Sequence, residues 1–476
     1  MKFNKKQSQT IENFEGGQAF VQSAKLEFIS ILLTSFVQDQ FYRSESETVL
    51  RICELIDEID DLKFVAKAAI YARTEFGMRS VSHVVAGELA KRARGLTWTR
   101  DFFDKIVYRP DDMMEILSYY FFTEKKLTNP LRDGFARALT RFDEYSLAKY
   151  RGEGKRIKLV DVVNLCHPKS TEAIDKLMKG TLKSSDTWES ELTRAGQQAN
   201  SDEEKAELKA AVWKRLIEER KIGYFALLRN LRNIIEQSPG ALSRALELLV
   251  DEEWIKNSLI LPFRFLTATS EIEKLNGDGV RETLVALAKA TDLSLANVPQ
   301  LDGKNLVALD TSKSMMGRPI EIGALFASAI YKTNDADFMA FTNDAKYVTL
   351  NPLDSTATIA ERIISMAEIG GTNFHSVFEI ADKAYDRIII LSDMQGWIGD
   401  DVPTKAFNDY KKRTGADPSV FSFDLQGYGT LQFPEKKVFT LAGFSEKVFD
   451  VLKLLESDRG ALVNEIEKIE LGEKTG

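Results

Sequence analysis

The chain has 476 residues, too many for one ordinary hydrophobic core, so two or three domains are expected. Apolar residues make up 44% of it and charged residues 29%, a composition that is typical of a globular protein and excludes extensive disorder. The net charge of −8 excludes a generic nucleic-acid coat, so any nucleic-acid binding must come from a local basic patch.

The N-terminal region carries no recognisable targeting signal. Its basic start runs into polar residues and not into the apolar stretch that a signal peptide needs. The longest apolar region, FISILLTSFV at residues 28–37, is about half as long as a membrane span. We therefore expect a cytoplasmic protein with no membrane partner. Only Cys53 and Cys166 are present, which gives neither a disulfide framework nor a zinc site, and we expect two buried thiols.

Helix signals dominate the chain up to about residue 295. Pro110 with two acidic residues behind it marks a helix start, and Asn129 is expected to cap a helix that has Pro130 at its first position. Strand-like alternation is scarce there. The pattern predicts a long α-helical array, for which stacked pairs of the HEAT type would fit, although no regular internal period is visible.

From residue 296 onwards, predicted strands and helices alternate. The expected elements are strands at NLVALD, ADFMAFTND, KYVTL, RIIILSD, SVFSFDL and VFTLAGF, with helices from Pro319, Thr358 and Thr404 and a C-terminal helix. Such alternation predicts a mostly parallel α/β sheet covered by helices on both faces. Residues 301–476 hold 27 acidic and 19 basic residues, which is the whole net charge. We predict two domains, residues 1–295 and residues 296–476.

Oxygen-bearing side chains follow the predicted strands of the second domain. Asp310, Ser312 and Ser314 stand at alternate positions after NLVALD, Thr372 follows a Gly-Gly turn, and Asp393 ends RIIILSD. Because ligands of open α/β sheets bind where parallel strands end, we expect these side chains to meet. Carboxylates and hydroxyls are the hard ligands that Mg²⁺ or Mn²⁺ prefers. The sequence therefore predicts a divalent metal site that is ready to accept an acidic ligand.

This D-x-S-x-S, GGT and strand-ending Asp pattern resembles the metal-ion-dependent adhesion site (MIDAS) of von Willebrand factor type A (vWA) domains, over the whole second half of the chain. Catalysis is not expected. Ser312 stands where D-x-D phosphotransfer enzymes need a second carboxylate, and no glycine-rich nucleotide motif is present. Only His83, His167 and His375 are available for acid–base work; we expect the first to be a core or capping residue and the last to face solvent.

Basic residues cluster in several places of the first domain, and two of these clusters are stronger candidates for RNA binding than KRARGLTWTR at residues 91–100. The first cluster consists of Lys149, Arg151, Lys155, Arg156, Lys158, His167 and Lys169. The second is the pair Arg229 and Arg232, which we expect on one helix face because they lie three positions apart. Both clusters could bind phosphates, but a solvated basic helix face and surface ion pairs remain the alternative.

Long segments of the first domain, KIVYRPDDMMEILSYY at 105–120, the stretch 129–170, YFALLRNLRNI and ILPFRFLTA, resemble the TROVE module of the Ro autoantigen family. Proteins of that family join a TROVE module to a vWA domain. The resemblance implies a ring of HEAT-like repeats clasped by the α/β domain. It also implies that small noncoding Y RNAs bind the outer basic surface, including His167, and that misfolded RNAs insert single-stranded 3′ ends into a central hole.

That role would be RNA quality control, without DNA binding, and an exoribonuclease or another acidic protein is a partner to expect at the metal site. A metal-dependent protein-interaction module that binds an acidic partner residue is the alternative. The helical half is shorter than expected for the animal proteins, which puts the full extent of the Y RNA surface in question.

Overall fold

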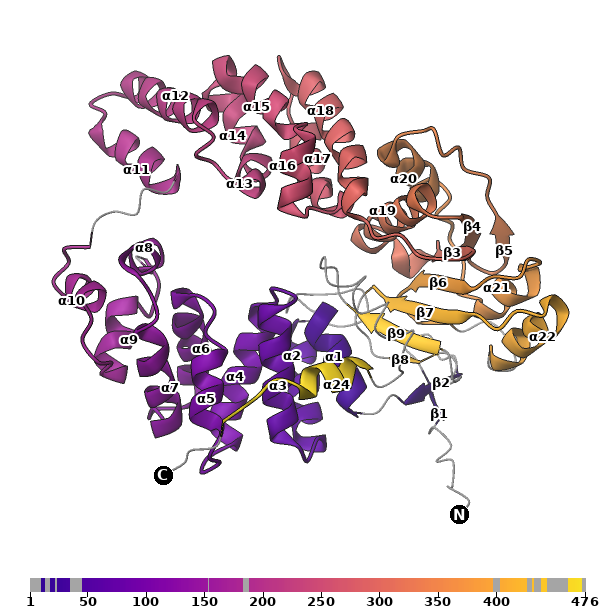
Figure 1. Cartoon of the computed structure of the whole chain (residues 1–476), viewed down its shortest axis with the longest axis horizontal. Helices are drawn as coiled ribbons and strands as arrows, with labels where there is room; N and C mark the ends of the chain where they lie inside the picture. Colours follow the sequence, from indigo (N-terminus) through magenta and orange to yellow (C-terminus); the bar gives the residue numbers. More distant parts are fainter. Residues whose placement is uncertain are drawn as a thin grey trace.

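The computed structural model describes residues 10–12, 18–21, 24–34, 45–152, 154–182, 188–396, 403–425, 430–431, 438–442 and 461–472. Over these residues the chain forms a helical array followed by an α/β domain, and the ribbon follows a ring-like path (Figure 1). The expected fold class is thereby confirmed.

The helical array has a first and a second part. The first consists of α1 (Ala24–Thr34), α2 (Glu45–Glu58), α3 (Leu62–Thr74), α4 (Ser80–Arg92), α5 (Thr99–Lys105), α6 (Pro110–Thr123), α7 (Asn129–Leu139), α8 (Glu144–Lys149), α9 (Leu159–Cys166) and α10 (Glu172–Met178). Here α3 packs on α4 and α5, α4 on α6, and α5 on α7. From α1 to α7, each helix thus packs on the next but one, as in stacked helical repeats.

The second part has its own hydrophobic core, which surrounds the fully buried Trp213. It consists of α11 (Trp188–Gln198), α12 (Asp202–Glu218), α13 (Tyr224–Arg229), α14 (Leu231–Gln237), η1 (Pro239–Ala241), α15 (Leu242–Leu249), α16 (Glu252–Ser258), η2 (Pro262–Arg264), α17 (Phe265–Glu273), α18 (Val280–Leu293) and η3 (Ser294–Asn297).

Local sequence patterns explain where some of these helices begin. Pro110 is the first residue of α6, as predicted, because its missing N–H costs nothing there. Asn129 is not a cap: it is already the first residue of α7, and Thr128 stands before it in an extended conformation. The difference is one residue, within the usual variation of helix ends.

A six-stranded sheet forms the centre of the α/β domain. Its strands are β3 (Asn305–Asp310), β4 (Ala336–Phe341), β5 (Ala345–Tyr347), β6 (Arg387–Ser392), β7 (Ser419–Asp424) and β9 (Val438–Ala442), in the order β5-β4-β3-β6-β7-β9. All pairs are parallel except β4 with the edge strand β5. The prediction of a mostly parallel sheet is confirmed.

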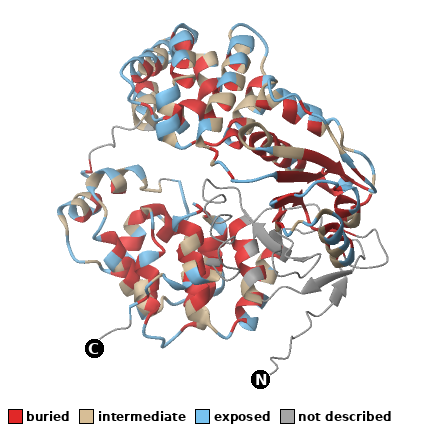
Figure 2. Ribbon diagram, turned by 45° about the vertical axis from the view of Figure 1, so that its right-hand side comes forward, coloured by how far each residue is buried: buried red, intermediate tan, exposed pale blue. Residues whose placement is uncertain are grey.

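Helices cover both faces of this sheet. The domain contains η4 (Lys313–Met315), α19 (Arg318–Thr333), α20 (Thr356–Ile364), α21 (Phe374–Ile380) and α22 (Thr404–Thr414). Along β3, Val307 and Leu309 enter one core while Leu306 and Ala308 enter another, so every residue of the strand is buried. Figure 2 shows the central strands of the sheet mostly as buried, beside helices that also carry exposed residues. Helix α21 was not predicted.

The α/β domain contacts both ends of the helical array. At one end, Asp292 of α18 accepts hydrogen bonds from Thr356 N at 2.8 Å and from Lys332 Nζ at 3.2 Å. At the other end, the N-terminal β1 (Thr10–Glu12) and β2 (Gln18–Val21) form a small antiparallel sheet with β8 (Thr430–Leu431). The C-terminal α24 (Ala461–Glu467) packs on α3.

The division at residue 295 stays a prediction; α18 ends at Leu293 and the first sheet strand begins at Asn305. Within the described ranges, no helix combines the length and the apolar character that crossing a bilayer would require.

Candidate metal centre and candidate RNA-binding surface

The predicted metal ligands lie at the carboxyl ends of two neighbouring strands. β3 ends at Asp310, and the short turn into η4 carries Ser312 and Ser314. β6 pairs in parallel with β3 and ends directly before Asp393. Thr372 enters from the loop before α21, where Gly371 N donates a hydrogen bond of 2.8 Å to Asn343 Oδ1 and so fixes the Gly-Gly turn.

The structure brings these five side chains together. Thr372 Oγ1 lies 3.3 Å from Asp310 Oδ2 and 3.1 Å from Ser312 Oγ. Ser312 Oγ lies 3.3 Å from Ser314 Oγ, and the Ser314 side chain hydrogen-bonds to Asp393. All five are buried. The cluster is therefore a compact group of largely buried oxygen atoms.

This arrangement disfavours the ionised forms of the two carboxyl groups. Burial, and after it the nearby Asp310 carboxylate, raises the pKa of Asp393 to about 8. Burial also raises the pKa of Asp310, against hydrogen bonds from Ser392 and Ser312. Asp393 Oδ2 is buried and has no hydrogen-bond partner among the described residues. A divalent cation would satisfy that oxygen and remove the repulsion.

The donor set fits a hard cation. No group of three or more His, Cys, Asp or Glu side chains that could hold a metal occurs within the described ranges, so the soft or imidazole-rich sites typical of zinc are not found there. Two carboxylates and three hydroxyls, with water completing the shell, suit Mg²⁺ or Mn²⁺.

Two contributors to this centre were not predicted. Ser392 Oγ donates a hydrogen bond of 2.6 Å to Asp310 Oδ2, and the buried Asp424, at the end of β7, adds to the raised pKa of Asp393. Both stand at the ends of predicted strands. The rule that ligands bind where parallel strands end, which identified Asp310 and Asp393, also points to Ser392 and Asp424.

The remaining histidines and the cysteines have structural environments. His83 is buried, as expected, and its Nε2 lies 2.8 Å from Asp112 Oδ1. His375 is half-buried on α21, so the expectation that it faces solvent is only partly met. Cys166 is buried, and burial raises its pKa to about 12. Cys53 is only half-buried, because its neighbour Ile52 takes the core-facing position of α2.

Most residues of the first basic cluster are exposed around the loop between α8 and α9. The exposed members are Lys149, Lys155, Arg156, Lys158, His167 and Lys169. Lys155 forms an ion pair with Glu115. Arg151 is half-buried, and its Nη2 donates a hydrogen bond of 2.7 Å to Leu182 O. His167 ends α9 in the left-handed conformation, with φ of 50°, and its N–H bonds to Val163 O.

The second basic cluster does not share a helix face, so that prediction is wrong. Arg229 ends α13 and Arg232 lies in α14, because the helix breaks at Asn230 between them. The Asn230 amide Nδ2 donates to Ala226 O at 2.8 Å, a local hydrogen bond that competes with the helical ladder. Both arginines are exposed, but Arg232 forms ion pairs with Glu236 and Glu271. The structure thus shows Arg232 in surface ion pairs, which was the alternative to phosphate binding.

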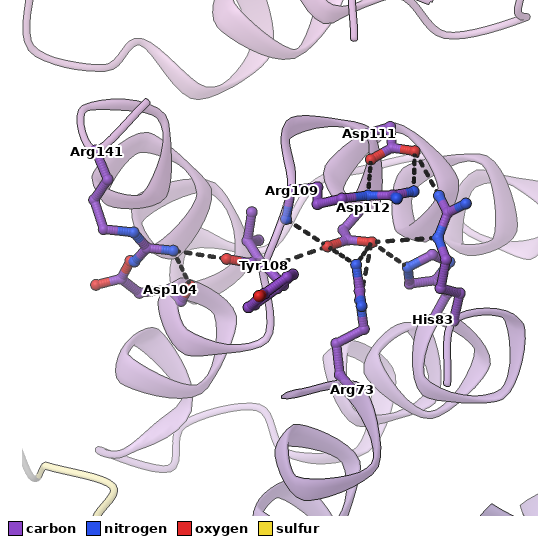
Figure 3. A network of polar contacts seen from close by, with 10 residues as sticks. Arg73, His83, Asp104, Tyr108, Arg109, Asp111, Asp112 and Arg141 are labelled. Carbon is purple, nitrogen blue, oxygen red and sulfur yellow. Dashed lines mark hydrogen bonds and ion pairs between the residues drawn. The ribbon is translucent and has the colours of Figure 1, made fainter. Parts of the chain in front are cut away.

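A buried polar network in the first part of the array was missed altogether (Figure 3). Its centre is Asp112, which is fully buried and accepts hydrogen bonds from Arg73, from His83 and from the backbone N–H groups of Tyr108 and Arg109. Burial alone would raise the pKa of Asp112, but the His83 hydrogen bond and the Arg73 charge outweigh it and lower the pKa to about 2. The side-chain partners lie on α3 and α4, far from Asp112 in the sequence, so no local pattern predicts the network.

Comparison with known families assigns both halves of the chain. The TROVE domain matches residues 21–181 and 172–317, and the Ro60 vWA domain matches residues 304–455. Among solved structures, the RO (RSR) protein of Deinococcus radiodurans has the same fold, with a TM-score of 0.63 at 18% identity over 89% of this chain and 97% of that one.

Two curated relatives share part of the sequence. Telomerase protein component 1 of Mus musculus is 25% identical over 341 residues, which are 54% of this chain and 13% of that protein. The RNA-binding protein RO60 of Deinococcus radiodurans is 26% identical over 227 residues, which are 42% of each chain. The matches thus span less than half the length of either relative.

Proposed function

We propose that this chain, which belongs to the TROVE domain family and carries a Ro60 vWA domain behind its TROVE domain, is a non-enzymatic RNA-binding protein. The TROVE match extends over residues 21–317, more than half of the chain. One relative is named an RNA-binding protein, and we carry that activity over.

The observation that carries this proposal is the basic loop between α8 and α9. Residues 145–158 hold five basic residues and one acidic residue, in a chain whose net charge is −8. Arg156 and Lys158 in the loop and Lys169 after α9 are exposed. Several phosphates could be neutralised there, each with release of a counterion.

Salt dependence of RNA binding tests this surface. The triple variant Arg156→Gln, Lys158→Gln, Lys169→Gln should weaken binding of a structured small RNA and flatten the slope of log affinity against log salt by about 2 units. Lys412→Gln, which changes an exposed basic residue of α22 in the α/β domain, is the matched control. An unchanged slope in the triple variant would remove the loop from the interface.

We further propose two RNA classes. Small noncoding RNAs of the Y type would bind the outer surface that includes His167. Single-stranded 3′ ends of misfolded RNAs would bind inside the ring, near Arg229, in RNA quality control. The resemblance to Ro proteins supports this assignment, together with the location of His167 on α9 and Arg229 on α13 in different parts of the array.

A second function is proposed for the α/β domain: capture of an acidic side chain of a partner protein, an exoribonuclease among the candidates, through Mg²⁺ or Mn²⁺. The observation in its favour is the buried, unpartnered Asp393 Oδ2 in a cluster of oxygen atoms. Asp310, Ser312, Ser314, Thr372 and Asp393 would hold the ion. The ion would supply an open coordination position for a carboxylate.

The two functions are separable by purification from the native cells. RNA that copurifies and is removed by nuclease, with a fall in the ratio of absorbance at 260 and 280 nm, supports the first. A protein partner that stays bound after nuclease but dissociates with EDTA supports the second. Neither RNA nor an EDTA-sensitive partner in such preparations would argue against both.

A further inference from the structure

Three tyrosine rings of the helical array lie beside positively charged side chains. The Arg73 guanidinium is 5.1 Å from the centre of the Tyr108 ring, and that of Arg109 is 5.0 Å from the centre of the Tyr150 ring. The Lys149 ammonium lies 5.9 Å from the Tyr145 ring and 5.7 Å from the Tyr150 ring. These side chains come from α3, from the turn before α6 and from α8 with the residue after it.

The contacts form two groups, Arg73 with Tyr108, and Arg109 and Lys149 with Tyr150 and Tyr145. Tyr108 and Arg109 are neighbours in the chain, which brings the two groups close together. Here four contacts join six side chains, three of which come from residues 145–150. The same stretch leads directly into the basic loop that carries Arg156 and Lys158.

The rings are open to solvent at the outer ends of the row. Tyr108 is 60% exposed and Tyr145 is 48% exposed. Large aromatic surfaces exposed on a folded domain next to basic side chains are the usual means by which proteins hold unpaired bases, since every base has a π-face and the phosphates need cations. A duplex offers no such faces, because its bases are stacked on one another.

The row is held rigidly by the buried network around Asp112. Tyr108 N and Arg109 N both donate to Asp112 Oδ2, at 3.0 Å and 2.8 Å. The same carboxylate binds Arg73, whose guanidinium lies beside the Tyr108 ring (Figure 3). Tyr108 and Arg109 are thus fixed at the backbone before any ligand arrives, which reduces the entropy lost on binding.

We propose that Tyr108, Tyr145 and Tyr150, with Arg109 and Lys149 beside them, form a base-stacking surface for single-stranded RNA. The inference rests on the proposed RNA binding and specifies it: the surface selects unpaired nucleotides by their exposed bases, without preference for sequence.

Fluorescence anisotropy with a short single-stranded RNA tests the proposal. The double variant Tyr108→Ala, Tyr145→Ala should bind about tenfold or more weakly, while the salt slope stays as in the wild type because no phosphate contact is lost. Tyr108→Phe with Tyr145→Phe should restore binding. The wild type and both double variants should bind a blunt duplex of the same sequence with equal affinity.

Phe122→Ala is the matched control. Phe122, on the last turn of α6, is 82% exposed, and no cation lies over its ring within the described ranges, so its loss should leave affinity unchanged. Equal affinity of the wild type and the double alanine variant would overturn the stacking surface. A wild type that binds no RNA at all would instead overturn the proposed function.

An abasic strand gives a readout that needs no substitution. The wild type should bind a strand with abasic sites more weakly than the intact strand, and the double alanine variant should bind both alike. If the wild type binds abasic and intact strands equally, base stacking is excluded, whatever the folding of the variants.

Discussion

Asp112 shows how a single buried carboxylate is kept ionised in this protein. Its partners Arg73 and His83 come from α3 and α4, and its backbone donors come from the turn before α6. Arg73 is buried as well, so each charge depends on the other for compensation. The same contacts fix Tyr108 and Arg109, which connects the stability of the array to the proposed RNA surface.

The first prediction concerns acid stability. The pKa of Asp112 is about 2 in the folded protein against an ordinary value of 3.8. A lowered pKa contributes stability that is complete above about pH 4 and is lost as the pH falls toward 2, here about 2 kcal/mol. Urea unfolding at pH 7, 4, 3 and 2 measures it. Asp112→Asn should cost about 3–5 kcal/mol at pH 7, because Arg73 stays buried and unpaired.

The variant also isolates the source of the acid sensitivity. Between pH 4 and pH 2, the free energy of unfolding of the Asp112→Asn variant should fall by about 2 kcal/mol less than that of the wild type. If both proteins lose the same free energy of unfolding in that range, other carboxylates are responsible.

The second prediction concerns the proposed metal ligands. Only the folded state assembles them, so Mg²⁺ or Mn²⁺ at roughly 100-fold over its dissociation constant should stabilise the protein by about 2.7 kcal/mol. Asp310→Ala should abolish this metal-dependent stabilisation, which is measured as a rise in melting temperature, and should leave RNA binding intact. Asp344→Ala, which removes an exposed carboxylate from the turn between β4 and β5, should keep it. A wild-type melting curve that ignores both metal and EDTA would contradict the site.

At the scale of the element, two helix ends decide how the proposed RNA contacts are presented. His167 terminates α9 with φ of 50°, a conformation that Asn adopts more easily than Ala. Arg229 terminates α13, because Asn230 breaks the helix. Substitutions that test RNA contacts must therefore leave these helix ends intact.

The third prediction separates the two helix ends by ligand. His167→Asn keeps the left-handed cap and should weaken binding of a structured small RNA about tenfold, the loss of roughly 1.4 kcal/mol. Arg229→Ala should weaken binding of an RNA with a single-stranded 3′ tail by a similar factor. Each variant should leave the other RNA unaffected, as competition binding measures. Equal losses for both RNAs in both variants would mean one shared surface.

At the scale of the whole molecule, each end of the chain packs on the domain that lies at the other end of the sequence. The N-terminal β2 pairs with β8, in the chain stretch between β7 and β9 of the α/β domain, at Phe20 and Leu431. The segment after the sheet returns to the first helices, where Lys67 Nζ donates to Glu467 O at 2.6 Å and Gly472 N donates to Asp101 Oδ2 at 2.9 Å. The ring-like path is thus closed by contacts between residues about 400 positions apart.

The fourth prediction tests this closure. Leu462 and Ile466 of α24 are buried, and each substitution by Ala should cost about 2 kcal/mol or more. Hydrogen exchange of the double variant should rise in α3, on which α24 packs, and stay unchanged in α21. Lys468→Ala, which changes an exposed position next to α24, is the control. Unchanged exchange in α3 would show that the C-terminal segment does not hold the ring closed.

The sequence alone determined the features that depend on neighbouring residues. The alternation of buried strands and helices after residue 296, the helix start at Pro110 and the acids and hydroxyls at strand ends are all local patterns. Parallel strands place their carboxyl ends at one edge, so locating Asp310 and Asp393 at two strand ends was enough to predict that they meet.

Only the tertiary structure decided the features that depend on distant partners. Asp112 is ionised because of residues 29 and 39 positions away, Arg232 is paired with Glu271, and the pairing of β2 with β8 joins the two ends of the chain. A charged side chain is equally compatible with solvent, an ion pair or a phosphate until its surroundings are known. The free energy that decides among them comes from burial and from opposing charges, and the folded chain alone brings these together.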